Sequence, residues 1–128
     1  MRFLIDTHTL IWLWLDDEQL PSTVVDSLSD GGNDVAVPTV CAWEISNKVR
    51  GGKLPQMADY VARYDELVAA ARFRHLDLRF DHALRAGLLP GAHRDPFDRL
   101  IAGQALVEDM VIVTRDPQFA AFGCRTLW

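Results

Sequence analysis

The sequence contains few cysteines. Only two, Cys41 and Cys124, occur among its 128 residues. Two are too few for a disulfide framework, and these two lack the spacing of a cysteine metal site. We therefore expect both to be buried apolar residues of a protein that resides in the reducing cytoplasm.

The sequence also lacks an excess of positive charge. Asp and Glu number 18 against 13 Lys and Arg, so the formal net charge is −5. Proteins that bind nucleic acid through their general surface are usually basic, and the balance argues against that class. The argument weakens if several acids are concentrated in one pocket, because a bound metal ion there reverses the local charge.

Long apolar runs, linkers and internal repeats are absent as well. Asp6 and His8 interrupt the apolar start, no cleavage site for a signal peptide follows, and the run to Leu15 is too short and too polar to cross a bilayer. We expect no targeting segment and no membrane association. The length and a hydrophobic fraction of 49% predict one globular domain over residues 1–128.

Short apolar segments alternate along the chain with segments of helical periodicity. Thr39 is an expected helix N-cap, and Asp95 before Pro96 is a stronger one. The alternation favours a parallel α/β sheet with helices on both faces. Strands are predicted at 2–6, 35–37, 73–78, 110–114 and 125–128, and helices at 7–15, 21–28, 39–49, 57–72, 81–89 and 95–106, with a short helix after Pro117.

Four acidic residues fall on the same predicted rim of this sheet. Asp6 and Asp116 follow strands, and Glu44 and Asp98 lie near the starts of helices. Two carboxylates about 4 Å apart repel by roughly 4 kcal/mol at an effective dielectric constant near 20, which protonation or a divalent cation would relieve. An all-carboxylate set favours Mg²⁺ or Mn²⁺ over zinc, and such a site suits phosphodiester hydrolysis.

Each acid also has a purely structural interpretation. Asp6, Asp116 and especially Asp95 are good helix caps, and Asp98 shares a helix face with Asp95, where it can neutralise the helix N-terminus. Glu44 is harder to explain in this way, because a charge among buried neighbours needs a partner. The neighbours expected to be buried are Val40, Ala42, Trp43 and Ile45.

Four segments together resemble the PIN domain. They are Ile5–His8, Trp43–Ile45, His93–Ala102 and Val113–Asp116. The third of these is the most specific, and it is similar to one branch of the VapC-type toxins of bacterial toxin–antitoxin pairs. The resemblance covers nearly the whole chain and is weakest between Gly52 and His75.

The resemblance implies a three-layer α/β/α fold with a mostly parallel central sheet and RNA cleavage that depends on Mg²⁺ or Mn²⁺. It also implies a homodimer and a cognate antitoxin that covers the active site. By position, Asp6, Glu44, Asp98 and Asp116 match the family's acidic quartet. Asp6 and Asp98 are then the expected direct metal ligands. Glu44 binds a second metal or orients the water, and Asp116 acts directly or through a water. Asp95 departs from the pattern and leaves open which of Asp95 and Asp98 faces the metal, although the spacing favours Asp98.

Further residues are candidates for contact with RNA. Thr7 and Thr114 adjoin the acids and are expected either to hydrogen-bond them and metal-bound waters or to cap helices. Arginine binds phosphate through its bidentate fork, and Arg115 and Arg94 are the candidates of this type in the proposed site, Arg115 being the first choice. His8 and His93 are candidates for hydrogen bonds to the substrate or for proton transfer. Other candidate phosphate contacts are Arg99 near the acids and Lys48, Arg50 and Lys53 after the third helix. The tryptophans, expected in the core or at a dimer or antitoxin interface, are Trp12, Trp14, Trp43 and Trp128.

Two other functions compete with the nuclease hypothesis. A phosphoacceptor receiver domain has a similar length and an acidic pocket. It needs paired acids after the first strand and a late lysine, however, whereas Thr7 follows Asp6 here and no lysine occurs after Lys53. A non-catalytic interaction module, whose acids only cap helices, predicts no metal binding.

Overall fold

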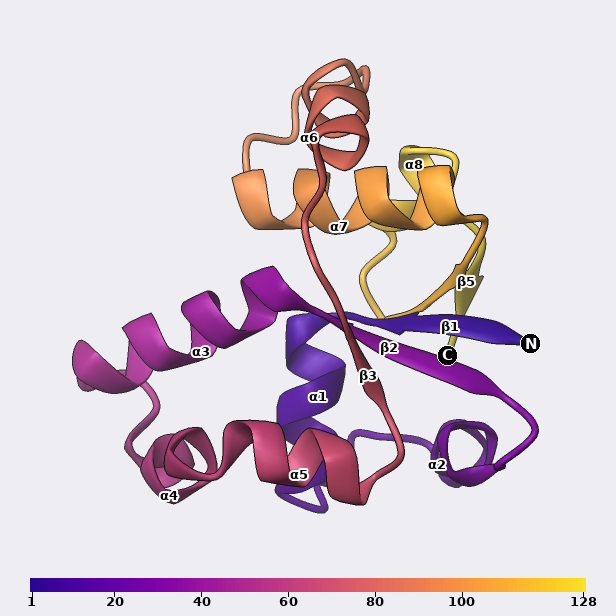
Figure 1. Cartoon of the computed structure of the whole chain (residues 1–128). Coiled ribbons are helices and arrows are strands. Elements are labelled where there is room, and N and C mark those ends of the chain that lie inside the picture. The colour runs from indigo at the N-terminus through magenta and orange to yellow at the C-terminus, as the bar shows by residue number, and fades with distance from the viewer.

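A five-stranded parallel sheet forms the centre of the computed structural model, which describes residues 1–128 (Figure 1). The strand order is β3-β2-β1-β4-β5, and every pair of neighbours is parallel. The predicted parallel α/β sheet is therefore confirmed. The strands are β1 (Arg2–Ile5), β2 (Asp34–Pro38), β3 (Arg74–Leu76), β4 (Val111–Val113) and β5 (Thr126–Leu127).

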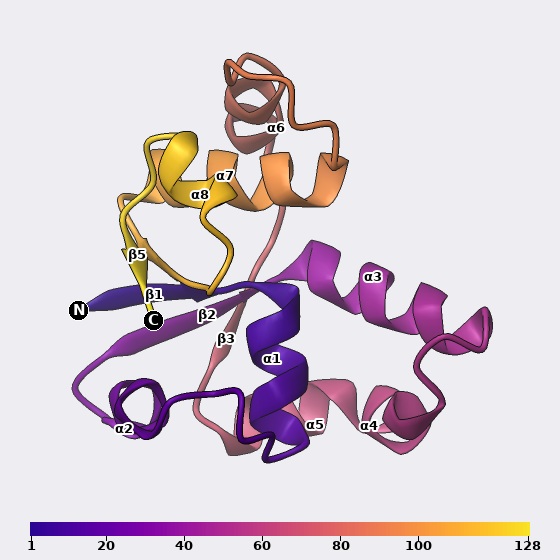
Figure 2. The same ribbon diagram turned by 180° about the vertical axis from the view of Figure 1, so that it is seen from behind.

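Helices cover both faces of the sheet. Helices α6, α7 and α8 lie on one face and α1, α2, α4 and α5 on the other, while α3 runs outward from the end of β2 (Figures 1 and 2). None of the helices combines the length and the hydrophobicity needed to span a membrane. The helices are α1 (Thr7–Trp14), α2 (Ser22–Ser29), α3 (Thr39–Arg50), the 3₁₀ helix η1 (Pro55–Met57), α4 (Ala58–Ala62), α5 (Tyr64–Ala70), α6 (Phe80–Gly87), α7 (Pro96–Glu108) and α8 (Gln118–Ala121).

The core lies between the sheet and these two helical layers. Leu4, Ile5 and Ile112 of the central strands are fully buried, as are Leu10 of α1 and Ile101 of α7 on opposite faces. A strand buried on both faces is apolar at successive positions, as β1 and β4 are. This packing holds the central strands in place, and with them the residues that follow β1 and β4 at the carboxyl edge of the sheet.

Two local predictions were wrong. The single helix predicted over residues 57–72 is interrupted at Arg63, whose backbone leaves the helical region, and it becomes η1, α4 and α5. The break was hidden because the apolar periodicity continues across it: Tyr60 and Tyr64, on either side, both pack on Trp14. Thr39 does not cap α3. Its hydroxyl donates instead to the carbonyl of Leu76 and the carboxylate of Asp77, joining α3 to the end of β3.

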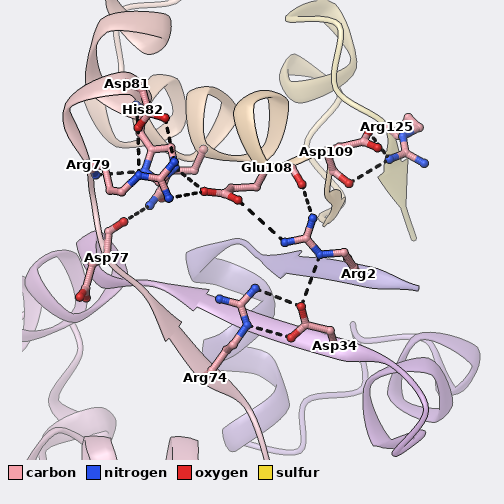
Figure 3. A network of polar contacts seen from close by, with 11 residues as sticks. Arg2, Asp34, Arg74, Asp77, Arg79, Asp81, His82, Glu108, Asp109 and Arg125 are labelled. Carbon is pink, nitrogen blue, oxygen red and sulfur yellow. Dashed lines mark hydrogen bonds and ion pairs between the residues drawn. The ribbon is translucent and has the colours of Figure 1, made fainter.

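A network of ion pairs closes the amino ends of the strands (Figure 3). Asp34 at the start of β2 accepts two hydrogen bonds from Arg74, at 2.9 and 3.0 Å, and lies 3.5 Å from Arg2. Glu108, at the end of α7, binds Arg79 at 2.7 Å and His82 at 2.9 Å, while Arg2 donates to its backbone carbonyl. The acids at this end of the sheet are thus matched by arginines.

Candidate active site

Asp6 lies directly after β1 and is only 6% exposed. Its Oδ1 accepts a 2.9 Å hydrogen bond from the backbone N–H of Thr9, so it caps α1. Its Oδ2 accepts a 2.5 Å hydrogen bond from the hydroxyl of Thr114, which follows β4. The capping interpretation of Asp6 is therefore correct. The same bonds hold a buried carboxylate in one orientation at the carboxyl end of the sheet.

Asp116 is connected to Asp6 through Thr114. The backbone N–H of Asp116 donates to the Thr114 hydroxyl at 3.0 Å, and Asp116 Oδ1 accepts from the backbone N–H of Gln118 at the start of α8. Asp6 and Asp116 line the same hollow, which has a volume of about 300 Å³. The structure thus brings together two acids that lie far apart in the sequence.

Glu44 on α3 is tied to the same region by Thr7. The Thr7 hydroxyl donates to Glu44 Oε1 at 2.6 Å, and Lys48 Nζ lies 3.5 Å from Oε2. Of the four neighbours of Glu44 that were expected to be buried, only Ile45 is: Val40 and Ala42 are half-buried, and Trp43 is 56% exposed. The expectation failed at Trp43 because its ring stacks on Phe97 of α7 and does not enter the core.

Cys41 is buried beside these acids and is not a nucleophile. Its Sγ lies 3.3 Å from the hydroxyl of Thr7. Burial raises the pKa of the Cys41 thiol to about 12, and the negative charges of Asp6 and Glu44 act in the same direction. The thiol therefore stays protonated, while Cys41 and Cys124 are both free and buried as expected.

The start of α7 supplies Asp95 and Asp98. Asp95 Oδ1 accepts from the backbone N–H groups of Phe97 at 2.9 Å and Asp98 at 3.4 Å, which confirms Asp95 as the helix cap. Asp98 Oδ2 forms a 2.8 Å hydrogen bond with His93 Nε2. Burial raises the pKa of Asp98, as do the charges of Asp95 and Asp116, whereas the His93 hydrogen bond lowers it. The charges of Asp95 and Asp116 thus both disfavour ionisation of Asp98.

Two overlapping sets of donors can be drawn from these residues. His93, Asp95 and Asp98 place ligand atoms within 4.8 Å of one another. The acids predicted from the sheet edge form the other set and share only Asp98 with the first, but no three of them come within that distance of one another. Each set contains a helix cap, because Asp95 accepts from the backbone of α7 and Asp6 accepts from the backbone of α1.

Little positive charge offsets these acids. Lys48 approaches Glu44 and His93 approaches Asp98, but no arginine or lysine pairs with Asp6, Asp98 or Asp116. Asp6 is buried and Asp98 half-buried, and such carboxylates are costly without a cation, whereas Asp116 is exposed. Carboxylate oxygens are the ligands that Mg²⁺ and Mn²⁺ prefer. The residues present therefore fit a hard divalent cation.

The predicted phosphate contacts differ in what they do in the structure. Arg99 donates to the carbonyls of Leu89, Gly91 and His93, so it fastens the loop before α7 and is no longer a candidate. Arg94 is exposed and makes no side-chain hydrogen bond. Arg115 is exposed and lies at the acidic hollow.

Two features of the site have no clear sequence signal. His93 precedes the first turn of α7, so helical spacing does not reveal its bond to Asp98. The sequence singled out Arg115 but not its partner Trp12, whose ring lies 4.6 Å below the guanidinium carbon. The separation of more than 100 residues between them leaves no local pattern.

Comparison with known proteins adds a family and several structural neighbours. The family model described as PIN domain matches residues 3–123, whereas none of the curated protein sequences matches. The fold is similar to VapBC2 from Rickettsia felis bound to a DNA fragment from its promoter, with a TM-score of 0.74, 18% identity, and coverage of 99% of this chain and 98% of the other. FitAB bound to an IR36 DNA fragment gives a TM-score of 0.69, 21% identity, and coverage of 98% and 93%. VapBC-1 from nontypeable Haemophilus influenzae gives a TM-score of 0.73, 18% identity, and coverage of 99% of this chain and 97% of the other.

Proposed function

The chain belongs to the PIN domain family, and from this premise we propose that it is a metal-dependent endoribonuclease, the toxin of a toxin–antitoxin pair. The observation that carries the proposal is the gathering of carboxylates at the carboxyl end of the sheet, among which Asp6, Asp98 and Asp116 form no ion pair with an arginine or a lysine. Asp6 and Asp116 share a hollow, and the pKa of Asp98 is raised by burial and by the charges of Asp95 and Asp116. Acids that repel one another in this way are suited to hold Mg²⁺ or Mn²⁺.

Asp6 and Asp98 are the proposed direct metal ligands. Asp6 is oriented by the Thr9 backbone and the Thr114 hydroxyl, and Asp98 by His93. When bound, the metal ion orients and activates a water and stabilises the leaving oxygen of the phosphodiester. The bonds to Thr114 and His93 fix the two carboxylates before substrate arrives, which keeps the cost of reorganisation low.

Glu44 and Asp116 complete the proposed site. Thr7 holds Glu44 Oε1, and Glu44 orients the attacking water or binds a second cation. Asp116 is exposed at the hollow and acts on the metal directly or through a water. Arg115, with Arg94 further out, is the proposed contact to the RNA phosphates.

A protein partner and self-association belong to the same proposal. The structural neighbours are two-component complexes by name, VapBC2, VapBC-1 and FitAB, and we propose a cognate antitoxin that covers the acids. A homodimer is supported by an apolar stripe on α6. Phe80, Leu84 and Leu88, spaced four residues apart, are 81%, 53% and 74% exposed, and exposed stripes of this kind mark association surfaces. The two free thiols support a cytoplasmic location.

The test is cleavage of RNA by the purified chain in Mg²⁺ or Mn²⁺. Asp6→Asn and Asp98→Asn should each reduce cleavage at least about 100-fold, since loss of a residue that merely supports a ligand already costs 10- to 100-fold in metal sites. Asparagine caps a helix as well as aspartate does, so Asp6→Asn keeps α1 intact. Asp109→Asn is the matched control, because Asp109 is exposed and pairs with Arg125 at the amino end of the sheet.

A second pair of variants separates the two sets of donors. Asp95→Asn preserves the cap of α7 and should retain far more activity than Asp98→Asn. The reverse order would assign the metal to Asp95. Calorimetric titration with Mn²⁺ tests the remaining alternative: the proposal expects binding that Asp6→Asn and Asp98→Asn weaken, whereas a non-catalytic module whose acids are caps would bind no metal. If Asp6→Asn and Asp98→Asn both cleave RNA at the wild-type rate, the proposal is refuted.

A further inference from the structure

The hollow beside Asp6 and Asp116 also contains side chains to which the proposed metal chemistry gives no role, and Arg115, the proposed phosphate contact, lies among them. Besides the two acids, it is lined by His8, Trp12, Arg115 and Pro117. At about 300 Å³, its volume is at the lower end of the range for small-molecule sites. The hollow therefore has room for one compact group next to the acids.

One wall of the hollow is aromatic and held in place by packing. His8 and Trp12 lie one helical turn apart on α1, with ring centroids 5.9 Å apart. Trp12 is also packed edge-on against Trp128, with a centroid distance of 5.6 Å, and contacts the hydrophobic core. A ring fixed in this way presents a surface for stacking without losing further side-chain freedom.

Arg115 lies over this wall without an acidic partner. Its guanidinium carbon is 4.6 Å from the centre of the Trp12 ring, and its one side-chain hydrogen bond, 3.2 Å long, goes to the amide oxygen of Gln19. Although Asp6 and Asp116 line the same hollow, Arg115 forms an ion pair with neither. Its positive charge is thus left for a ligand.

An aromatic ring and an unpaired guanidinium beside a phosphodiesterase centre have the chemistry of a base-binding site. Proteins recognise unpaired RNA bases by stacking them on aromatic rings and on arginine planes. A base inside a duplex has both faces covered and cannot enter such a site. The guanidinium can also meet the phosphate attached to a stacked nucleoside.

We propose that His8, Trp12 and Arg115 form a subsite for one unpaired nucleobase adjacent to the scissile phosphate, with the base stacked against the Trp12–Arg115 pair. The inference rests on the proposed ribonuclease function and adds a recognition element to it: cleavage depends on a base bound by these three residues beside the cleaved bond.

The test uses a single-stranded RNA whose cleavage position has been mapped with the full chain in Mg²⁺. The same RNA is then prepared without the base at each of the two nucleotides that flank the cleaved bond. Stacking of one base gives roughly a tenfold effect or more. The ratio of kcat/KM for the intact RNA to that for one of the two abasic RNAs should therefore be about ten or higher. Annealing a complementary strand across the position should suppress cleavage.

Variants assign this ratio to the subsite. Arg115→Gln and Trp12→Leu should lower it toward one. Because Trp12 also packs on Trp128, His8→Ala is measured as well, since His8 is exposed and its loss leaves the core intact. Arg125→Gln is the control, removing the same charge at the other end of the sheet, where Arg125 pairs with Asp109 (Figure 3). This control should keep the wild-type ratio.

The outcomes distinguish the two proposals. A wild-type chain that cleaves intact and abasic RNA equally well, or cleaves duplex RNA as fast as single strands, overturns the base subsite and leaves the nuclease assignment standing. A base effect that survives in all three subsite variants also overturns the assignment of these residues. A chain that cleaves no RNA overturns the proposed function and this subsite together.

Discussion

Gly103 allows α6 and α7 to cross at close range, and we predict that Gly103→Ala destabilises the protein. A Cβ atom at this position would lie 2.7 Å from the backbone oxygen of His82 and 2.9 Å from both the Cβ and the backbone nitrogen of Ala86. Two of these three atoms belong to the backbone of α6, so no side-chain rotation relieves the contact. The two helices must move apart to accept the methyl group.

The cost of that movement is set by the packing around it. Extra methyl groups forced into packed interiors typically cost about 1 to 3 kcal/mol, and a backbone collision belongs in the upper half of that range. Alanine recovers somewhat under 1 kcal/mol through its better helix propensity. A net loss of about 1 to 2 kcal/mol follows. For a chain of 128 residues, 1 kcal/mol corresponds to about 4 °C in Tm, so Tm should fall by roughly 4 to 8 °C.

Thermal unfolding followed by circular dichroism measures the effect, and Gly87→Ala is the matched control. Gly87 is the last residue of α6, and a Cβ atom there meets nothing within 4 Å. The same glycine-to-alanine change should therefore leave Tm unchanged or raise it slightly. If Gly103→Ala unfolds at or above the wild-type temperature, the close crossing of α6 and α7 does not limit the fold and the reasoning is wrong.

Two further predictions concern charged groups. The hydrogen bond from His82, followed by that from Arg79, holds the pKa of Glu108 below its ordinary value. The stabilisation this represents is therefore complete above pH 4.5 and is lost as the pH falls through the folded-state value. Glu108→Gln should cost about 1 to 2 kcal/mol in unfolding free energy at pH 7, and the cost should shrink steadily as the pH falls below 4.5, as a series of urea titrations can test. Asp98→Asn should instead raise the free energy of unfolding of the metal-free protein. Burial and neighbouring acids raise the pKa of Asp98, so its charge disfavours folding at neutral pH. A gain on the order of 1 kcal/mol is expected once solvent screening and the weakened bond to His93 are counted. A variant less stable than wild type in EDTA would contradict this.

The order of the elements could be predicted because it depends on local pattern. The apolar runs of β1 and β4 and the helical periodicity between them identify a parallel sheet, and a parallel sheet brings Asp6 and Asp116 to one edge. The site is in this sense a consequence of topology. The Asp95 cap was also predictable, since capping needs only neighbouring backbone groups.

The features that the sequence did not reveal all depend on contacts between distant segments. Arg99 looked like a phosphate ligand, yet it binds three carbonyls of the loop before α7. Thr39 looked like a cap but joins β3. The exposure of Trp43 follows from its stacking on Phe97. In each case the side chain had two uses compatible with its local sequence, and only the packing of another element decided between them.

The net negative charge illustrates the same point, because its meaning depends on where the acids lie. At the amino end of the sheet, Asp34 and Glu108 form ion pairs with Arg74 and Arg79. At the carboxyl end, Asp6 and Asp116 have no such partners. Carboxylates that repel one another stay close only if the rest of the fold holds them in place. Here the buried central strands and the threonine hydroxyls do so. The net charge of −5 therefore does not argue against the proposed function, because a divalent cation at the carboxyl end of the sheet would reverse the charge at the place where RNA is proposed to bind.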